Sequence, residues 1–337
     1  SLSAARGAAV LPPPPLPRAF TSVARAAAPS QLVARLRGGA QPQRALFARR
    51  AVSSAGRVSA PHLRMLSGLG ISAAVVGGFN MLGFAITLVR PELGEKITDL
   101  FGTGSIAVSA VATHAASGVG LALRPSLVTA AVVVWGVRLA GFLFYRIINT
   151  GSDSRLSAYF ETTGSTAAFW TVSALWGWLN LLPQSLLCFA PNAAAPLGAG
   201  AAVAAALFLA GFVAESLADL QKLAFKADPA SKNQFCNVGL WSQCRYPNYA
   251  GELTVWTSIF FLAAPALMGA PGGGLLARYG AVAAGTLSPA FVALIVLGVS
   301  GVPLAEARNE ERFGGRTDYE AYKRDTPLLV PKALLGR

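Results

Sequence analysis

Long runs of apolar residues without a charged side chain dominate this sequence from residue 65 onward. The chain of 337 residues is 53% hydrophobic but only 13% charged, whereas a soluble domain carries about 25% charged residues. Several of the runs exceed the roughly 18 residues that a helix needs to cross a bilayer. We therefore predict an all-α, polytopic transmembrane helical bundle in contact with membrane lipids.

Seven segments are long and apolar enough to be candidate spans. They are residues 67–89, 103–123, 125–145, 167–190, 194–216, 250–270 and 280–303. Only Arg124 and Pro125 separate the second from the third, so that boundary is weakly marked. The fifth is rich in Gly and Ala, which lets helix backbones approach closely inside a bundle. We expect about seven spans in one membrane domain over residues 65–337.

The first 64 residues differ sharply from the rest of the chain. They hold ten arginines, no lysine and no acidic residue, and subtracting these ten charges from the net charge of +13 leaves +3. A basic, acid-free, hydroxyl-rich segment is typical of an organellar transit peptide. The alternatives are a disordered basic tail, or an upstream misannotation with Met65, the first methionine, as the true start. Since the excess charge lies outside the apolar part, we expect no nucleic-acid partner.

The charged loops indicate the orientation in the membrane. With seven spans, residues 90–102, 146–166, 217–249 and 304–337 lie on one side and carry fifteen Lys and Arg, against Arg124 and Arg278 on the other side. The positive-inside rule places the basic side in the cytosol, or in a stromal or matrix compartment. The leader favours a plastid or mitochondrial membrane, with the endoplasmic reticulum as the alternative.

The supply of soft metal ligands is small. Two histidines and three cysteines are present, namely His62, His114, Cys188, Cys236 and Cys244, without CxxC or HxxH spacing. We therefore expect no zinc or haem site. Cys236 and Cys244 are expected to be reduced thiols rather than a disulfide.

The segment GLWSQCRYPNYAGE, residues 239–252, is a dense polar motif between apolar segments. Pro247 fixes its own φ angle and biases Tyr246 away from helix, which predicts a loop or a broken helix start. Asn248 can then cap the next helix, with Glu252 one turn inside, near the positive end of the helix dipole. Such a cluster at a membrane boundary is costly unless it binds something polar, so we interpret it as half of a cofactor site.

A stripe of charged residues ends the fifth candidate span. Glu215, Asp219, Lys222 and Lys226 follow one another at spacings of four, three and four, which places them on one helix face. They can simply pair with one another along the helix. However, an intramembrane acid such as Glu215 is a functional candidate by default, and Lys226 suits a phosphate.

Two further segments carry buried or clustered charge. Arg138 lies in the middle of the third candidate span, where it should face the interior and find a partner, and Arg146 follows eight residues later on a similar face. The tail after the last span alternates acids and bases and has Tyr319 and Tyr322 one turn apart. By itself this pattern favours a solvated amphipathic tail. Because it comes directly after the last span, the tail can also fold back over the loop at 217–249 and close a pocket.

These segments together resemble the steroid 5α-reductase C-terminal superfamily, and more closely its subgroup of unknown function, DUF1295. The matching pieces are WGVRL with the downstream RIINTGSDSRL, then ADLQKLAFKAD, GLWSQCRYPNYAGE and a Tyr-x-x-Tyr-x-x-x-Thr-Pro tail. Each piece is weakly specific, but their order and spacing over residues 135–331 are specific. The resemblance implies a multi-helix membrane fold, similar to the steroid reductases, whose C-terminal half binds NADPH.

The resemblance also implies roles for particular residues. In the better understood reductases, the Asn and Glu of an Asn-aromatic-x-Gly-Glu motif contact the cofactor, and Asn248 and Glu252 occupy these positions. The acid and the base of the preceding helix match Asp219 and Lys226. The other expected cofactor contacts are Lys222, Trp241, Arg245, Tyr246, Arg146 and Tyr322.

The implied reaction is hydride transfer to a hydrophobic substrate that enters from the bilayer. A nicotinamide ring favours a dry aromatic slot, such as Trp241, Tyr246 and Tyr249 could form. Reduction of an enone makes an enolate, which needs a proton or hydrogen-bond donor at its oxygen. We predict Tyr249 and Glu252 as the catalytic residues, with Tyr249 as the proton donor. Residues 67–134 lack a counterpart of the steroid enzymes' N-terminal half, which leaves the substrate open.

Two alternatives remain at this stage. Isoprenylcysteine carboxyl methyltransferases of the same superfamily bind S-adenosylmethionine with an Arg-His-Pro motif and a tail bearing Glu-Glu and Phe-Gly. Glu310, Glu311, Phe313 and Gly314 resemble that tail, but Tyr246 stands at the histidine position. A non-catalytic membrane assembly protein is the second alternative, since such a protein needs packing residues only.

Overall fold

The computed structural model describes residues 61–151, 156, 158–269 and 275–336, all within one compact unit. The leader predicted for residues 1–64 lies almost entirely outside these residues. Helices and turns account for the regular structure of the described residues, and no strand is present among them. The prediction of an all-α bundle is therefore confirmed for the part of the chain that the structure describes.

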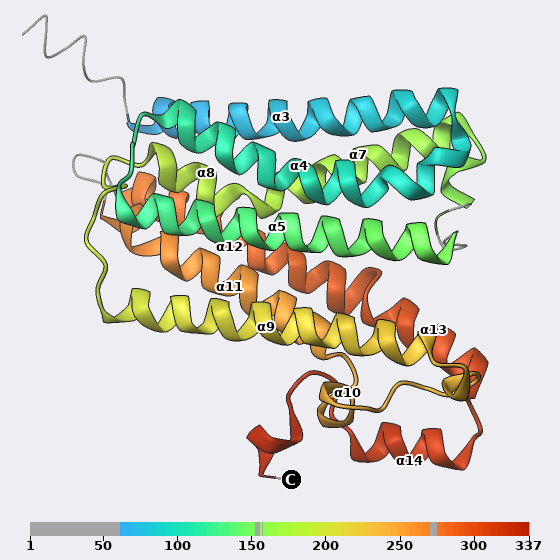
Figure 1. Ribbon diagram of the computed structural model, residues 1–337. Coiled ribbons are helices and arrows are strands. Elements are labelled where there is room, and N and C mark those ends of the chain that lie inside the picture. The colour runs from blue at the N-terminus through green and yellow to red at the C-terminus, as the bar shows by residue number, and fades with distance from the viewer. Residues whose placement is uncertain (1–60, 152–155, 157, 270–274, 337) are drawn as a thin grey trace, which may run out of the picture. The chain divides into compact units, whose positions relative to one another are not determined.

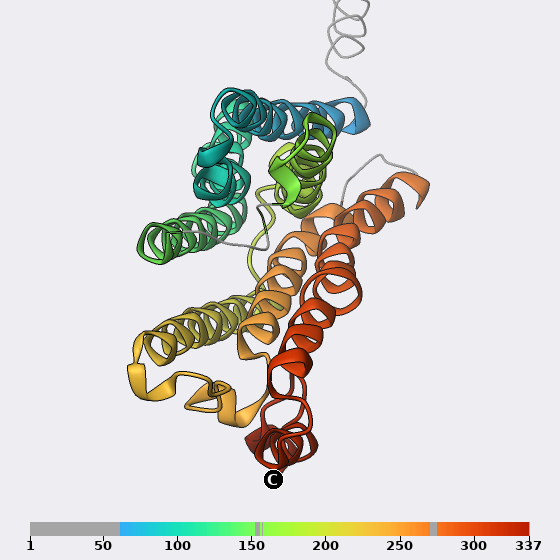
Figure 2. The same cartoon turned by 90° about the vertical axis from the view of Figure 1, so that its right-hand side faces the viewer.

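Three consecutive helices form the N-terminal part of the bundle (Figure 1). They are α3 (Pro61–Val89), α4 (Gly94–Ser117) and α5 (Leu123–Thr150), with the 3-10 turn η2 (Pro91–Leu93) between the first two. Figure 2 shows α4 lying between α3 and α5, both of which it contacts. Gly118 ends α4 with φ of 69°, a left-handed conformation that a residue without Cβ adopts readily.

The next helix is broken in two. After η3 (Ala158–Phe160), α7 (Thr163–Asn180) and α8 (Leu182–Phe189) meet at a bend of 48°. Pro183 lies at the start of α8, where its missing N–H leaves no helical hydrogen bond unmade. Every residue of α8 is buried. The break therefore directs α8 into the interior of the bundle.

The most extensive helix pair is formed by α9 (Ala199–Ala227) and α11 (Pro247–Met268). At their crossing Gly211 lies against Gly251. A Cβ atom on Gly251 would be 2.6 Å from the Gly211 carbonyl oxygen and 2.7 Å from the backbone nitrogen of Glu215. Since only glycine permits this approach, the pair brings the first turns of α11 against the charged end of α9.

α12 (Leu275–Leu294) packs along α11 and is followed by the π-helical turn η5 (Ile295–Val299) and by α13 (Val302–Phe313). The remaining short elements are η4 (Pro229–Ser231), α10 (Leu240–Gln243), α14 (Thr317–Asp325) and η6 (Lys332–Leu335). The short α10 and the start of α11 confirm that the chain between them, around Arg245, is not helical.

The opposite end of the bundle is held by a buried arginine. Arg124 donates hydrogen bonds to the backbone carbonyls of Ala195 at 3.3 Å, Pro196 at 2.7 Å and Leu262 at 2.6 Å. A guanidinium at this depth needs such partners. These bonds attach the start of α5 to the loop before α9 and to the last third of α11.

Fewer helices than predicted meet the length and apolarity of a span. Five do, and the broken pair α7–α8 would make a sixth. They are Leu63–Val89, Leu123–Asn149, Ala199–Ala227, Pro247–Met268 and Tyr279–Phe313. The predicted span at 103–123 is not among them, because it falls largely in α4, whose buried face carries hydroxyl groups such as Ser105, Ser109 and Thr113. The predicted count of seven therefore depends on α4 also crossing the membrane.

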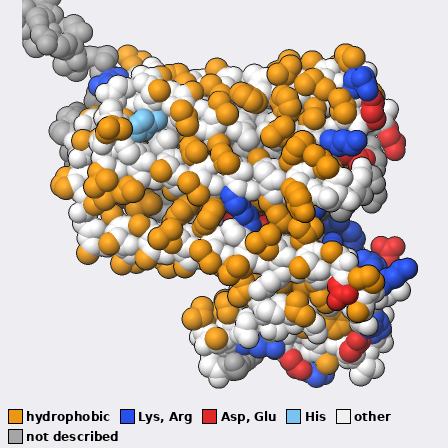
Figure 3. All heavy atoms as spheres, in the orientation of Figure 1, with side chains coloured by type: hydrophobic (Ala, Val, Ile, Leu, Met, Phe, Trp, Pro, Cys, Tyr) orange, Lys and Arg blue, Asp and Glu red, His pale blue; other side chains and the backbone are white. Residues whose placement is uncertain are grey.

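Charged side chains gather at one end of the bundle and on the adjoining C-terminal segment (Figure 3). The rest of the visible face is mainly hydrophobic. The long sides of the helices are thus suited to lipid, while the charged end is suited to water. This distribution agrees with the uneven placement of Lys and Arg in the sequence.

Replacing Gly251 by alanine should destabilise the protein by about 1–3 kcal/mol, because the new methyl group would overlap the Gly211 carbonyl. Gly200→Ala, in α9, is the matched control, since a Cβ atom there would meet nothing within 4 Å and alanine favours helix. Thermal unfolding in detergent, monitored by tryptophan fluorescence, gives the midpoint of each variant. Equal midpoints for the two variants would contradict the close packing of α9 on α11.

Candidate functional site

An arginine and two acids form a buried ionic network between α5 and α9. Arg138 donates from Nη1 to Glu215 Oε1 at 2.9 Å and from Nη2 to Asp219 Oδ2 at 2.8 Å. Glu215 is only 3% exposed. The prediction that Arg138 finds an interior partner is confirmed. The α9 acids form these ion pairs with α5, so the stripe is not explained by pairing along its own helix.

Tryptophan rings pack on the membrane-interior side of this network. The Nε1 of Trp135 donates to Glu215 Oε2 at 3.0 Å, so both oxygens of that carboxylate accept a hydrogen bond. The Trp135 ring lies edge-on to Trp256 at 4.8 Å and tilted to Trp176 at 6.4 Å. Trp135 and Trp256 are fully buried. A dry aromatic layer therefore borders the charged groups.

Glu252 brings a third carboxyl group to the network. The Gly211–Gly251 contact places this residue of α11 beside α9, close enough for its charge to interact with Glu215 and Asp219. Among the described residues, no side chain donates a hydrogen bond to the Glu252 carboxyl. Three acids from two helices thus meet where the bundle changes from dry to charged.

Asn248 does not cap α11, and this prediction was wrong. Pro247 occupies the first turn of the helix, so the N-cap position falls to Tyr246, which makes no side-chain cap. The Oδ1 of Asn248 is buried, and no hydrogen-bond donor reaches it among the described residues. Because a buried acceptor without a donor is costly, this atom is suited to accept an N–H from a ligand.

A lysine over a tryptophan lies on the water-facing side of the network. The Nζ of Lys222 is 4.0 Å from the centroid of the Trp241 ring, a cation–π contact. Trp241 is 2% exposed; its Nε1 donates to the Ala218 carbonyl at 2.9 Å, and its own carbonyl accepts from the Tyr322 hydroxyl at 2.7 Å. Burial raises the pKa of the Tyr322 phenol. Trp241 is thus a fixed support for Lys222 rather than an open slot for a ring.

Further cations surround Lys222. The charges of Lys226 and Arg308 act on Lys222, and that of Arg146 acts on Asp219. These residues come from α9, α13 and α5, which are far apart in sequence. A group of Lys and Arg from separate helices is suited to bind phosphate.

The chain before α11 is bound to α13 and to the C-terminal tail. Arg245 Nη1 donates to Glu306 Oε2 at 2.6 Å, and the Tyr246 hydroxyl donates to the other oxygen of Glu306. The backbone N–H groups of Arg245 and Tyr246 donate to the carbonyls of Pro327 and Leu328 at 2.9 and 3.0 Å. The tail therefore folds back over this loop, and it is not the solvated amphipathic tail that its sequence alone favours.

Tyr249, the predicted proton donor, stacks on Tyr246 with ring centroids 5.6 Å apart and an interplanar angle of 17°. Burial and the bond to Glu306 raise the pKa of the Tyr246 hydroxyl, so Tyr246 is a neutral phenol in this stack. Tyr249 lies three residues before Glu252 on α11, so the two predicted catalytic residues share one side of that helix.

The profile of one protein family matches residues 84–326, and its description reads "Protein of unknown function (DUF1295)". The match covers well over half of the chain and includes the ionic network, the α11 motif and most of the tail. The chain belongs to the DUF1295 family. No curated protein and no solved structure matched it.

Some site residues of this DUF1295 protein follow from the sequence and others do not. The structure adds Trp135, Trp256 and Glu306 to the predicted residues, and it gives Glu215, a candidate from the sequence, its partners Arg138 and Trp135. Spacing could have indicated Trp256, four residues after Glu252 on one helix face, but nothing local indicates Glu306, which reaches the site only through the tertiary fold.

The ligands available to a metal are sparse in this DUF1295 structure. Among the described residues, no group of three His, Cys, Asp or Glu side chains could hold a metal ion. Cys188, Cys236 and Cys244 are free thiols. Burial raises the pKa of Cys244 to about 11, so this thiol stays protonated at neutral pH.

Removing the guanidinium of Arg138 from the network should lower the stability of this DUF1295 protein. Arg138→Gln leaves Glu215 and Asp219 without their cation and should destabilise by about 3–5 kcal/mol. The triple variant that adds Glu215→Gln and Asp219→Asn should recover much of this loss. Arg90→Gln is the control, because the exposed Arg90–Glu92 pair contributes at most about 1 kcal/mol. Chemical denaturation in detergent measures all three, and equal stability of the Arg138 and Arg90 variants would contradict the network.

Proposed function

We propose that this protein is a membrane-embedded NADPH-dependent reductase that acts on a carbon–carbon double bond of a hydrophobic, lipid-like substrate. The observation that carries the proposal is the order of side chains along α9. Buried Glu215 is followed by Asp219, then by Lys222 on its Trp241 support, and then by Lys226. One helix thus carries acids in a dry layer at one end and cations at the other. A dinucleotide needs both environments, because its nicotinamide ring favours a dry slot and its phosphates need cations.

The residues present fit this cofactor. Lys222, Lys226 and Arg146 would bind its phosphates, for which clustered cations from separate helices are suited. The buried Oδ1 of Asn248 lacks a donor, and the carboxamide N–H of a nicotinamide would supply one. Arg245 would hold its loop against α13 through Glu306 rather than contact the ring.

NADPH, when bound, supplies the hydride for the reduction. The protein's own residues would orient the substrate, exclude water and supply a proton. Repulsion between neighbouring carboxylates favours a proton on one of them, and we place it on Glu252, which has no hydrogen-bonded cation among the described contacts. Glu252 or Tyr249 would then donate this proton to the substrate, and solvent at the charged end would replace it.

The substrate would enter from the bilayer. The apolar helix faces around the site contact lipid, and the aromatic layer of Trp135 and Trp256 offers no charged group to a ligand. A molecule that is apolar along most of its length, of steroid, isoprenoid or fatty type, suits this surface. The leader favours an organellar membrane, in plastid or mitochondrion, over the endoplasmic reticulum.

No contact favours the methyltransferase alternative. Phe313 packs on Phe235 at 5.9 Å and on Tyr319 at 5.7 Å, and Glu310 pairs with Lys323 at 2.7 Å. These tail residues, which resemble a methyltransferase motif, are engaged in holding the tail together. Binding of S-adenosylmethionine therefore enters as an outcome of the test, as does a non-catalytic assembly role.

Thermal unfolding of detergent-purified protein with NADPH or S-adenosylmethionine tests the proposal. A ligand at 100 times its Kd stabilises the folded state by about 2.7 kcal/mol, so NADPH should raise the midpoint. Asn248→Ala should abolish the shift, whereas Asn192→Ala, at the other end of the bundle, should keep it. A shift with S-adenosylmethionine alone would indicate a methyltransferase. No shift with either ligand would favour the assembly role.

A further inference from the structure

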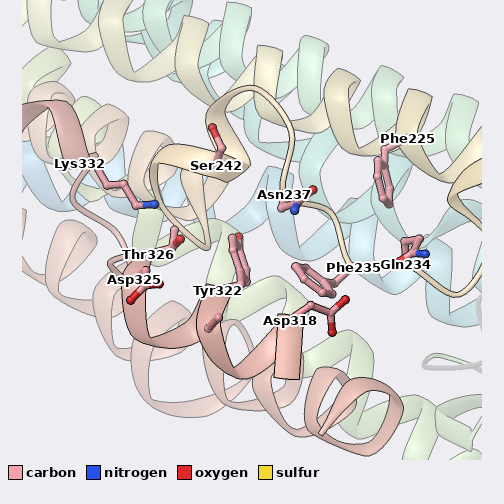
Figure 4. Close-up of a pocket in the computed structure, with 11 residues that line it drawn as sticks. Phe225, Gln234, Phe235, Asn237, Ser242, Asp318, Tyr322, Asp325, Thr326 and Lys332 are labelled. Atoms are coloured by element: carbon pink, nitrogen blue, oxygen red, sulfur yellow. The ribbon is translucent and has the colours of Figure 1, made fainter. Parts of the chain in front are cut away.

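A cavity of about 490 Å³, lined by both aromatic and polar side chains, lies between the end of α9, the chain before α11, and α14 with the tail after it (Figure 4). Of the residues that line it, Tyr322 alone belongs to the predicted site. The residues used below are Phe225, Asn237, Tyr322, Thr326 and Lys332. The tail therefore closes a second compartment beside the proposed cofactor site.

The cavity continues the order of side chains along α9. Phe225 follows Glu215 by ten residues of one unbroken helix, about 15 Å along its axis, and Lys222 lies between them. On the other wall, the Tyr322 hydroxyl binds the carbonyl of Trp241, whose ring supports Lys222. The cations proposed to bind phosphate thus lie between Glu215 and the cavity. The separation of Glu215 from the cavity is comparable to the length of an extended dinucleotide.

Lys332 is a cation without a close partner at this cavity. The acids of the lining have partners already: Asp318 accepts from Arg316 at 3.1 and 2.7 Å, and Asp325 accepts from Arg324 at 2.9 and 3.2 Å. No hydrogen bond or ion pair to Lys332 is present among the described residues, and Asp325 acts on it only at longer range. Figure 4 shows its amine pointing toward the cavity near Thr326.

The other walls suit a purine base. Phe225 and Tyr322 present aromatic rings, on which bases stack. The exposed side-chain amide of Asn237 offers a donor and an acceptor together, the pair that matches N6 and N7 of adenine. Aromatic rings, the amide of Asn237 and the amine of Lys332, which has no hydrogen bond or ion pair among the described residues, are groups suited to an adenosine that carries a phosphate.

We propose that this cavity binds the adenosine 2′-phosphate end of NADPH, with Lys332 on the 2′-phosphate. The inference rests on the proposed function and deepens it, because it assigns the preference for NADPH over NADH to a residue of the C-terminal tail. Lys332 is then a specificity-determining residue, distant from the reacting atoms.

The test compares four ligands on the full chain in detergent: NADPH, NADH, adenosine 2′,5′-bisphosphate and AMP. Lys332→Gln should weaken NADPH and the bisphosphate by about tenfold, and it should leave NADH and AMP unchanged, because these lack the 2′-phosphate. Lys232→Gln, an exposed lysine of the same side that does not line the cavity, should change none of the four. The readout is affinity by ligand fluorescence or calorimetry, independent of turnover.

Each outcome decides a separate point. A folded Lys332→Gln protein with an unchanged ratio of NADPH to NADH affinity would overturn the assignment while leaving the reductase proposal intact. Lys332-dependent binding in a protein that reduces no lipid would support the assignment and overturn the reductase. Failure of the folded wild-type protein to bind any of the four would overturn both.

Discussion

The ion pairs of Arg138 with Glu215 and Asp219 are the interaction on which the rest of the structure depends. Isolated charges inside a bilayer are costly, and removing one partner from a buried pair leaves the other uncompensated. These pairs therefore fix the register of α5 against α9. The Gly211–Gly251 contact then sets α11 against α9 and adds Glu252 to the same layer.

The two ends of α9 lie in different chemical environments. Its membrane end contributes an acid to a dry layer bordered by Trp135 and Trp256. Its water-facing end carries Lys222 and leads to the cavity that the tail closes. Electrostatic interactions are stronger in a dry site than in water, so a reaction that moves charge gains from the first environment, while a phosphorylated ligand needs the second.

The sequence predicted those features that depend on composition and on helix spacing. The all-α bundle and the interior partner of Arg138 are of this kind, whereas the alternating charges of the tail by themselves favoured a solvated segment. The cap at Asn248 was mispredicted because the helix already begins at Pro247, which leaves the N-cap position to Tyr246. The partner helix of Glu215 could not be predicted, because it depends on which helices are neighbours. The same is true of Glu306, which lies about 60 residues from the side chains that it binds.

Deuterium transfer into lipid tests the central claim most directly. The full chain, reconstituted in vesicles of lipid extracted from its native membrane, would be supplied with NADPH deuterated at C4 of the nicotinamide, on either face in turn. Mass spectrometry would follow the lipids. The account predicts deuterium on a carbon of one hydrophobic lipid that has lost a double bond, with loss of this product in Glu252→Gln. Wild-type protein that binds NADPH but transfers deuterium to no lipid would contradict it.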